Sequence, residues 1–257
     1  MSDWAGELTV GLGWVYYNGP VGDTEFHQHY AVQICFPFSG PLHIETQTEN
    51  QIVENILVVG SNVSHRLSSP SPTAQLLYIE PNLVRKNTAR LNMAQMAVLD
   101  LPKTQMESIK SALNIAATER GPNYGRRIAN LIWPHNSDCD VFLPIDPRIS
   151  QTLANIEAAE NLNLRLSQVI EGSGLSASRF RHLFSAQVGM SLKSYLLWTK
   201  LQRAIQSLAL DNSLTTAAHA AGFADSAHLS RTFRRTFGLA PADLNKNAHF
   251  TTRNHGR

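Results

Sequence analysis

The hydrophobic positions of this chain follow two different periods, one in each half. Between residues 8 and 81, short runs rich in β-branched and aromatic residues alternate with turn sequences containing Gly, Pro, Ser and Asn. Such runs are typical of strands, and many short strands at this spacing predict a small β-barrel or sandwich. The predicted strands are residues 12–17, 31–36, 42–46, 56–59 and 75–79.

From about residue 82 the hydrophobic spacing becomes that of helices. The apolar residues that recur at three and four positions are Met106, Ile109, Leu113 and Ala117. This spacing predicts a helical bridge over residues 82–132. A polar segment with prolines, residues 136–147, is the predicted linker. Beyond it the pattern indicates one helix after another, and the longest is predicted over residues 191–209.

Two stretches in this helical half, residues 174–184 and 222–233, carry the same pattern. In each, a glycine turn leads into a short helix with apolar residues on one face and Ser, His and Arg on the other. This is typical of tandem helix-turn-helix motifs, whose second helices enter the major groove of DNA. The helix between them, 19 residues long, would span about 28 Å. The two recognition helices, predicted over residues 177–187 and 226–237, would then lie close to one DNA turn apart, about 34 Å.

The polar faces of the two recognition helices supply the candidate DNA contacts. Arg pairs in bidentate fashion with guanine, so we expect Arg181 and Arg231 to read bases. Contacts to phosphate position a protein without specifying sequence, and we expect them from Arg234, Arg235 and Lys193. The other residues predicted to face DNA are Ser178, His182, Ser226, Ala227, His228 and Ser230.

The second stretch also carries a set of residues known from one family: Ala218, Gly222, Phe223, Asp225, Arg231, Phe233, Phe237, Gly238 and Pro241. On these residues, the segment 164–244 resembles the DNA-binding domain of AraC/XylS-type transcriptional regulators. The resemblance implies a sequence-specific regulator, in most cases an activator, with double-stranded DNA and RNA polymerase as partners. Two departures belong to the first of the two motifs: Ile170, just before the first stretch, stands where the family has a small alanine, and His182 stands where arginine is common.

The charge of the chain is distributed unevenly. Its net charge is only +2, but residues 1–144 hold 9 Lys and Arg against 13 Asp and Glu, whereas residues 145–257 hold 13 against 7. An acidic N-terminal part joined to a basic C-terminal part is typical of a sensor domain joined to a module that binds a polyanion. We therefore predict an α+β protein with a β-rich sensor domain over residues 1–135 and an all-α DNA-binding domain over residues 148–250.

The remaining composition narrows the class of protein. Cys35 and Cys139 are the only cysteines and are far apart, which argues against a disulfide framework or a cysteine zinc site. No apolar run approaches the roughly 20 residues that span a bilayer. The first residues lack the basic and apolar regions of a signal peptide. We expect a cytoplasmic protein that does not contact membranes.

Three histidines give the front domain its own candidate chemistry. His27 and His29 lie just before a predicted strand and His65 follows another, so the three could complete a metal site of the kind that cupin enzymes use. On His27, His29, Gly60 and His65 this domain resembles the cupin-like sensor domain of many AraC-type regulators. Gln33 stands where a cupin metal site has a carboxylate, so effector lining or local hydrogen bonding is favoured, and no cofactor is predicted. The candidate effector-binding residues are Trp14, Tyr16, His27, His29, Tyr30 and His65.

The sequence thus predicts a DNA-binding transcriptional regulator, not an enzyme. A small molecule bound in the front domain, or homodimerisation through helices around residues 106–117, would change how the rear domain engages DNA. Two alternatives remain at this stage. One is a metal-dependent cupin enzyme with a helical appendage, and the other is an effector-independent regulator whose paired helices bind protein.

Overall fold

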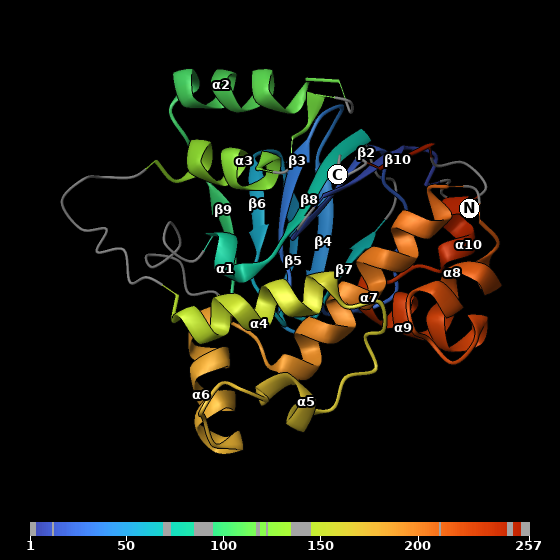
Figure 1. Ribbon diagram of the computed structural model, residues 1–257. Coiled ribbons are helices and arrows are strands. Elements are labelled where there is room, and N and C mark those ends of the chain that lie inside the picture. Colours follow the sequence, from blue (N-terminus) through green and yellow to red (C-terminus); the bar gives the residue numbers. More distant parts are fainter. Residues whose placement is uncertain are drawn as a thin grey trace.

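The computed structural model describes residues 4–11, 13–68, 73–84, 95–116, 119–121, 123–134, 145–210, 212–245 and 249–252. Two β-sheets and three helices form the N-terminal part, and seven helices, at the bottom and right of Figure 1, form the described C-terminal part. Most of the predicted linker, residues 136–144, lies outside the described residues, as do Ala117 and Cys139.

The larger sheet has seven strands in the order β10-β1-β2-β8-β3-β6-β9. Its strands are β1 (Glu7–Gly11), β2 (Trp14–Pro20), β3 (Val32–Pro37), β6 (Ile56–Val59), β8 (Thr73–Ile79), β9 (Met96–Leu99) and β10 (His249–Thr252). The smaller sheet has the order β5-β4-β7, from β4 (Leu42–Thr46), β5 (Asn50–Val53) and β7 (His65–Ser68). All neighbours are antiparallel except β1 and β10, which are parallel.

Strand alternation divides the aromatic residues of β2 between two cores. Val15 and Tyr17 belong to the core between the two sheets, whereas Trp14 and Tyr16 belong to a core on the other face of the large sheet. Successive strand residues point to opposite faces, which accounts for this separation. The second core lies under helices α1 (Pro81–Val84), α2 (Lys103–Leu113) and α3 (Tyr124–Ile132), seen above and beside the sheet in Figure 1.

The predicted fold class is confirmed, and the structure adds detail. Each of the five predicted strands overlaps an observed one, with β4 and β6 at the predicted bounds; residue 12 lies outside the described part. Strands β1, β5, β7, β9 and β10 were not predicted. Residues 82–132 were expected to be helical throughout, and this expectation is wrong for β9, which lies in that segment and pairs with β6. Strand β10 likewise follows the predicted helices and joins the N-terminal sheet.

The C-terminal part is a series of helices that contribute to two buried clusters, one of which they share with the sheets. The helices are α4 (Pro147–Ala158), α5 (Leu166–Ile170), α6 (Ala177–Val188), α7 (Leu192–Leu208), α8 (Leu214–Ala220), α9 (Ser226–Phe237) and α10 (Pro241–Asn245). Residues of α4, α5 and α6 share a core with the first turns of α7. The rest of α7 packs with α8 and α9 in the same buried cluster as the interior of the two sheets. Among the described residues, no helix combines the length and apolarity needed to cross a membrane.

Candidate nucleic-acid interface

Helices α5 and α6 form the first helix-turn-helix motif. Helix α6 begins because the side chain of Ser176 accepts a hydrogen bond from the backbone N–H of Arg179 at 3.3 Å. It ends at Gly189, whose φ of 84° is the left-handed conformation that glycine adopts readily. Phe180, Phe184 and Val188 are buried at four-residue spacing. The predicted DNA-facing residues on the opposite face are exposed: Ser178, Arg181 and His182.

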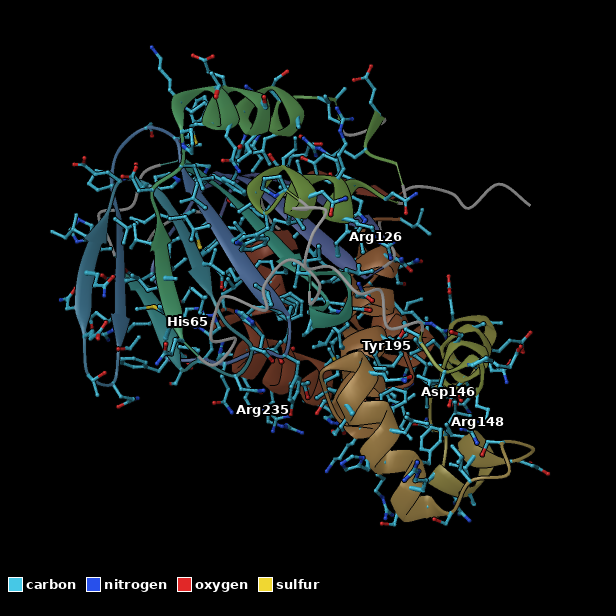
Figure 2. The ribbon with its side chains drawn as sticks, turned by 90° about the vertical axis from the view of Figure 1, so that its left-hand side faces the viewer. His65, Arg126, Asp146, Arg148, Tyr195 and Arg235 are labelled. Atoms are coloured by element: carbon cyan, nitrogen blue, oxygen red, sulfur yellow. The ribbon has the colours of Figure 1, made fainter. Side chains whose placement is uncertain are left out.

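Helices α8 and α9 form the second motif by the same local rules. The side chain of Asp225 accepts from the N–H of His228 at 2.6 Å and starts α9, and Gly238, with φ of 74°, ends it. The buried face consists mainly of Leu229, Phe233 and Phe237, again four residues apart. The exposed face carries Ala227, His228, Arg231, Arg234 and Arg235, and Figure 2 labels Arg235 at the surface.

The two predicted serines of α9 differ from the arginines in their exposure. Ser226 and Ser230 are half-buried, and the hydroxyl of Ser230 donates to the carbonyl of Ser226 at 2.8 Å. This bond holds the hydroxyl against its own helix. The arginines and His228 are therefore the groups of α9 that project furthest toward a ligand.

Helix α7 connects the two motifs and packs against both. Its 17 residues span about 26 Å, and Ser191 caps it by accepting from the N–H of Ser194 at 3.1 Å. Lys193 lies exposed in its first turn. In its centre, buried Trp198 contacts Phe237 with a ring separation of 6.3 Å. The spacer predicted over residues 191–209 is confirmed.

The end of α9 is docked on the N-terminal domain. The backbone N–H of Glu25 donates to the carbonyl of Gly238 at 2.8 Å, and the rings of Phe237 and Tyr78 lie edge to face at 5.5 Å. Close by, Arg234 Nε lies 3.7 Å from Glu25 Oε1, with both side chains more than half exposed. Helix α9 is thus attached to the N-terminal part through its last turn.

A small apolar cavity lies where the sheets meet α7 and α9. Its lining residues are Trp4, Leu8, Val15, Tyr17, Leu76, Tyr78, Ile205, Phe233, Phe237 and Leu239. The cavity volume is about 30 Å³, which is room for one or two waters. A larger occupant would have to displace side chains of both domains.

The structure places the candidate effector-binding residues in three different environments. Trp14 and Tyr16 lie under α2 and α3, and Tyr16 contacts the Arg120 guanidinium at 4.2 Å from its ring centre. Tyr30 packs, partly buried, against the core of the first motif. The three histidines lie together in a third place. None of these six residues lines the cavity between the domains, where Tyr17, the neighbour of Tyr16, takes the position that alternation gives it.

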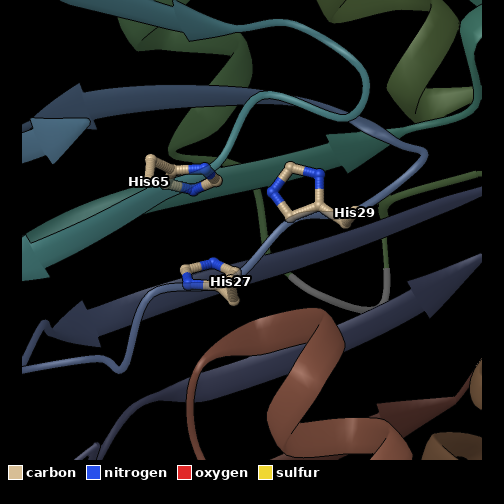
Figure 3. A group of neighbouring side chains, drawn as sticks. All are labelled: His27, His29 and His65. Carbon is tan, nitrogen blue, oxygen red and sulfur yellow. The ribbon is translucent and has the colours of Figure 1, made fainter. Parts of the chain in front are cut away.

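His27, His29 and His65 form a buried cluster, shown in Figure 3. A ring nitrogen from each lies within 4.8 Å of the other two, and the three side chains belong to residues no more than 4% exposed. His27 pairs with His65 in an isolated antiparallel bridge, while His29 lies outside the strands. The bridge brings the rings of His27 and His65 together. The His-x-His spacing suggests two imidazoles on one face of a single strand, and this interpretation is wrong because His29 lies outside the strands.

Gln33, on β3, completes this cluster. Its Oε1 lies 2.8 Å from His29 Nε2 and 3.0 Å from His65 Nε2, and the residue is fully buried. Burial lowers the pKa of His27 to about 3, with neighbouring His29 contributing, and burial also lowers the pKa of His29 and of His65. The rings are therefore neutral near pH 7. Cys35, predicted to be a buried small side chain, accepts a weak hydrogen bond from Gln33 at 3.2 Å.

Sequence reasoning missed the residues that join the cluster to α9. Glu25 and Tyr78 have no motif around them, and their roles depend on contacts over more than 150 positions of sequence. Gln33 was noticed only as the absence of a carboxylate. Its spacing of four residues from His29 was the available signal that it shares the site.

Comparison with known proteins agrees with the geometry of the C-terminal part. Residues 171–247 match the family model described as a helix-turn-helix domain. The chain is similar to the transcriptional activator RhaS of Klebsiella pneumoniae, at 26% identity over 82% of this chain and 75% of that protein. It is also similar to the transcriptional activator NphR of a Rhodococcus species, at 34% identity over 31% of this chain and 24% of that one.

The fold has a solved counterpart. A crystal structure of a ToxT variant from Vibrio cholerae aligns with a TM-score of 0.63 and 10% identity, covering 93% of this chain and 99% of that one. Wild-type ToxT, at a TM-score of 0.59, has been solved with an unsaturated fatty acid bound. The likeness confirms a two-domain arrangement of sheets followed by helices. The sequence matches confirm the resemblance of the C-terminal region to AraC/XylS-type domains.

Proposed function

We propose that this chain, whose C-terminal region is an AraC-type helix-turn-helix domain, is a sequence-specific DNA-binding transcriptional regulator. The observation that carries the proposal is the duplication in space of one local design. Helices α6 and α9 are each capped at both ends, bury aromatic residues on one face and expose Arg and His on the other. Two such helices joined by one rigid spacer fit successive major grooves on one side of a duplex.

The side chains take different roles in this proposal. Arg181 and Arg231 lie near the middle of exposed helix faces and are the base readers, because a guanidinium fits guanine O6 and N7. Arg234, Arg235 and Lys193 bind phosphates. The candidates Ser178, His182, Ala227 and His228 supply supporting contacts, and Ser226 and Ser230 mainly shape the helix surface. We assign DNA binding to the unit predicted over residues 148–250, whose helices run from α4 to α10, and sensing to the unit of residues 1–135. The last two residues of the first span belong to β10 and pair with the N-terminal sheet.

The regulatory direction follows from the relatives. RhaS and NphR are both described as transcriptional activators, and we propose that this chain activates transcription as well, through contact with RNA polymerase. A homodimer would use the outermost helix, α2, whose Lys103, Thr104 and Glu107 are exposed. An exposed helix at the sheet's outer face leaves the DNA-facing surface unobstructed.

An apolar small molecule is the effector that the interior favours. The cavity between the sheets and α7 and α9 is lined by apolar and aromatic side chains, contributed by both domains. The lining side chains leave only a small open volume. A bound molecule would therefore change the packing of Phe233 and Phe237 of α9. Effector binding would thereby change how α9 is docked on the N-terminal part.

Selection of bound duplexes from a random pool, followed by footprinting, tests the function. We expect a selected site in which two major-groove segments, about one helical turn apart on one face, are protected. The double variant Arg181→Ala, Arg231→Ala should abolish enrichment, and the exposed-residue control Arg148→Ala, on α4, should not. A pool without any enriched sequence would refute DNA recognition and favour the protein-interaction alternative.

A further inference from the structure

The hydrogen bonds of the three histidines determine which nitrogen of each ring carries its proton. Nδ1 of His27 lies 2.9 Å from the carbonyl of Glu25, Nδ1 of His29 lies 2.7 Å from that of Ala31, and Nδ1 of His65 lies 2.9 Å from that of Val63. A carbonyl oxygen only accepts, so each Nδ1 is the donor. The neutral rings therefore carry a lone pair on Nε2. Metal-binding histidines in proteins are commonly oriented by this same bond to a backbone carbonyl.

In the part of the chain that the structure describes, no donor faces these lone pairs as the Gln33 amide is oriented. His27 Nε2 is buried and has no hydrogen-bond partner among the described residues. The Nε2 atoms of His29 and His65 face Gln33 Oε1, itself an acceptor, at 2.8 and 3.0 Å. Rotating the amide of Gln33 by half a turn would provide donors for these two rings. It would still leave His27 Nε2 unsatisfied, which is costly in a buried position.

A cation at the centre would satisfy all four groups together. Neutral imidazole is the ligand that Zn²⁺ and neighbouring divalent metals prefer, and four ligands complete a tetrahedral shell. Ligand nitrogens around zinc lie about 3.4 Å apart at bond lengths near 2.0 Å. The present limit of 4.8 Å means that the rings need to close inward by about an ångström. We propose that His27, His29 and His65, with the amide oxygen of Gln33, form a binding site for one divalent transition-metal ion such as Zn²⁺, and that occupancy tightens the docking of α9.

The second part of the proposal follows from what surrounds the cluster. His27 lies against the end of α9, so closely that a Cβ built on Gly238 would lie 2.6 Å from His27 Nδ1. His29 contacts the ring of Tyr78 at 5.2 Å, and Tyr78 contacts Phe237 at 5.5 Å. A metal that fixes the rings of His27 and His29 would thus fix both the Gly238 turn and the Phe237 ring. The site stands on these contacts alone and does not depend on DNA binding.

Metal content and cobalt spectroscopy test the site on the full chain. Protein stripped with a chelator and then dialysed against Zn²⁺ should retain about one equivalent, and Co²⁺ should give the intense visible absorption of a four-coordinate ion. His27→Ala should remove both signals. His219→Ala, which removes an exposed histidine on α8, should change neither. Wild-type protein that retains no metal, or a signal lost equally in His219→Ala, would overturn the proposal.

A second variant keeps the test valid if His27→Ala fails to fold. Gln33→Glu places a carboxylate where the amide oxygen lies, so it should bind Zn²⁺ more tightly and keep the cobalt absorption at a shifted wavelength. If the cluster were only a hydrogen-bonded network, Gln33→Glu would bind no metal and would unfold more easily, because it buries a charge. That second result would contradict the site.

Hydrogen exchange tests the coupling to α9. In wild-type protein, Zn²⁺ should slow exchange of the Glu25 amide, which donates to Gly238, and of the last turn of α9. Amides at the middle of α6, in the separate core, provide the internal control and should not change. Bound zinc with unchanged exchange at Glu25 would leave the metal site in place but refute its effect on docking.

Discussion

The two helix-turn-helix motifs have nearly the same local construction but are integrated into the molecule in different ways. The first has its own core, built from α4, α5, α6 and the start of α7, with Phe180 and Phe184 at its centre. The second has no separate core, because Leu229, Phe233 and Phe237 lie in one buried cluster with the interior of the sheets. Local sequence therefore specifies a capped amphipathic helix in both motifs, whereas the surrounding contacts decide whether that helix is packed against the sheets.

The largest effect is expected when one buried aromatic side chain is removed from each motif, which tests whether each motif has its own core or shares one with the sheets. Phe184→Ala and Phe237→Ala should each lower the free energy of unfolding by about 3–5 kcal/mol. Chemical denaturation with hydrogen exchange should show that Phe184→Ala loosens the first motif alone. Phe237→Ala, which loses contacts to Tyr78 and Trp198, should also loosen the sheets. Unchanged protection of β8 in Phe237→Ala would contradict a shared core.

Two glycines with the same backbone conformation allow the cost of backbone strain to be distinguished from the cost of crowding at the docked end of α9. Gly174 and Gly238 have φ of 66° and 74°, but a Cβ on Gly174 would meet nothing within 4 Å, whereas one on Gly238 would meet Glu25, His27 and Thr24. Gly174→Ala should cost about 1–2 kcal/mol from backbone strain. Gly238→Ala should cost about 2–4 kcal/mol, because overpacking adds to the strain. Equal losses in thermal unfolding would mean that the docked turn adapts freely.

Alanine variants of the two corresponding arginines, Arg231 and Arg181, test whether both motifs contribute to sequence-specific DNA binding. Arg231→Ala should weaken binding to the selected site by about 1–3 kcal/mol and relax the choice of one base pair. Arg181→Ala should do the same at a base pair about one helical turn away. Fluorescence anisotropy with the selected and a scrambled duplex measures both. An equal loss on the two duplexes would assign the residue to phosphate contact.

The smallest expected effect concerns the ion pair that joins α9 to the sensor domain. Arg234→Ala should reduce the slope of log affinity against log salt by about one unit, if this side chain binds a phosphate. Glu25→Gln, which removes only its partner, should change the free energy of unfolding by less than about 1 kcal/mol, since the pair is exposed. A salt slope unaffected by Arg234→Ala would contradict the phosphate role.

The parts of the fold that follow from neighbouring residues were accessible from the sequence. Recognition helices, the capped spacer and the outward arginines depend on spacings of three and four residues and on Ser, Asp and Gly at helix ends. Strand β9 was missed because four apolar residues in a helical region carry no periodicity of their own. The histidine cluster depends on a bridge between His27 and His65, which are 38 positions apart, and local pattern cannot supply such a pairing.

Strand β10 gives the helical domain a second attachment to the sheets. The chain enters that domain before α4 and returns after α10, where residues 249–252 lie parallel to β1. This strand pairing, the docked end of α9 and the shared buried cluster together restrict how far the helices can move relative to the sheets. If an effector binds in the N-terminal part, we therefore expect a small displacement of the helices and not a wide separation of the two parts.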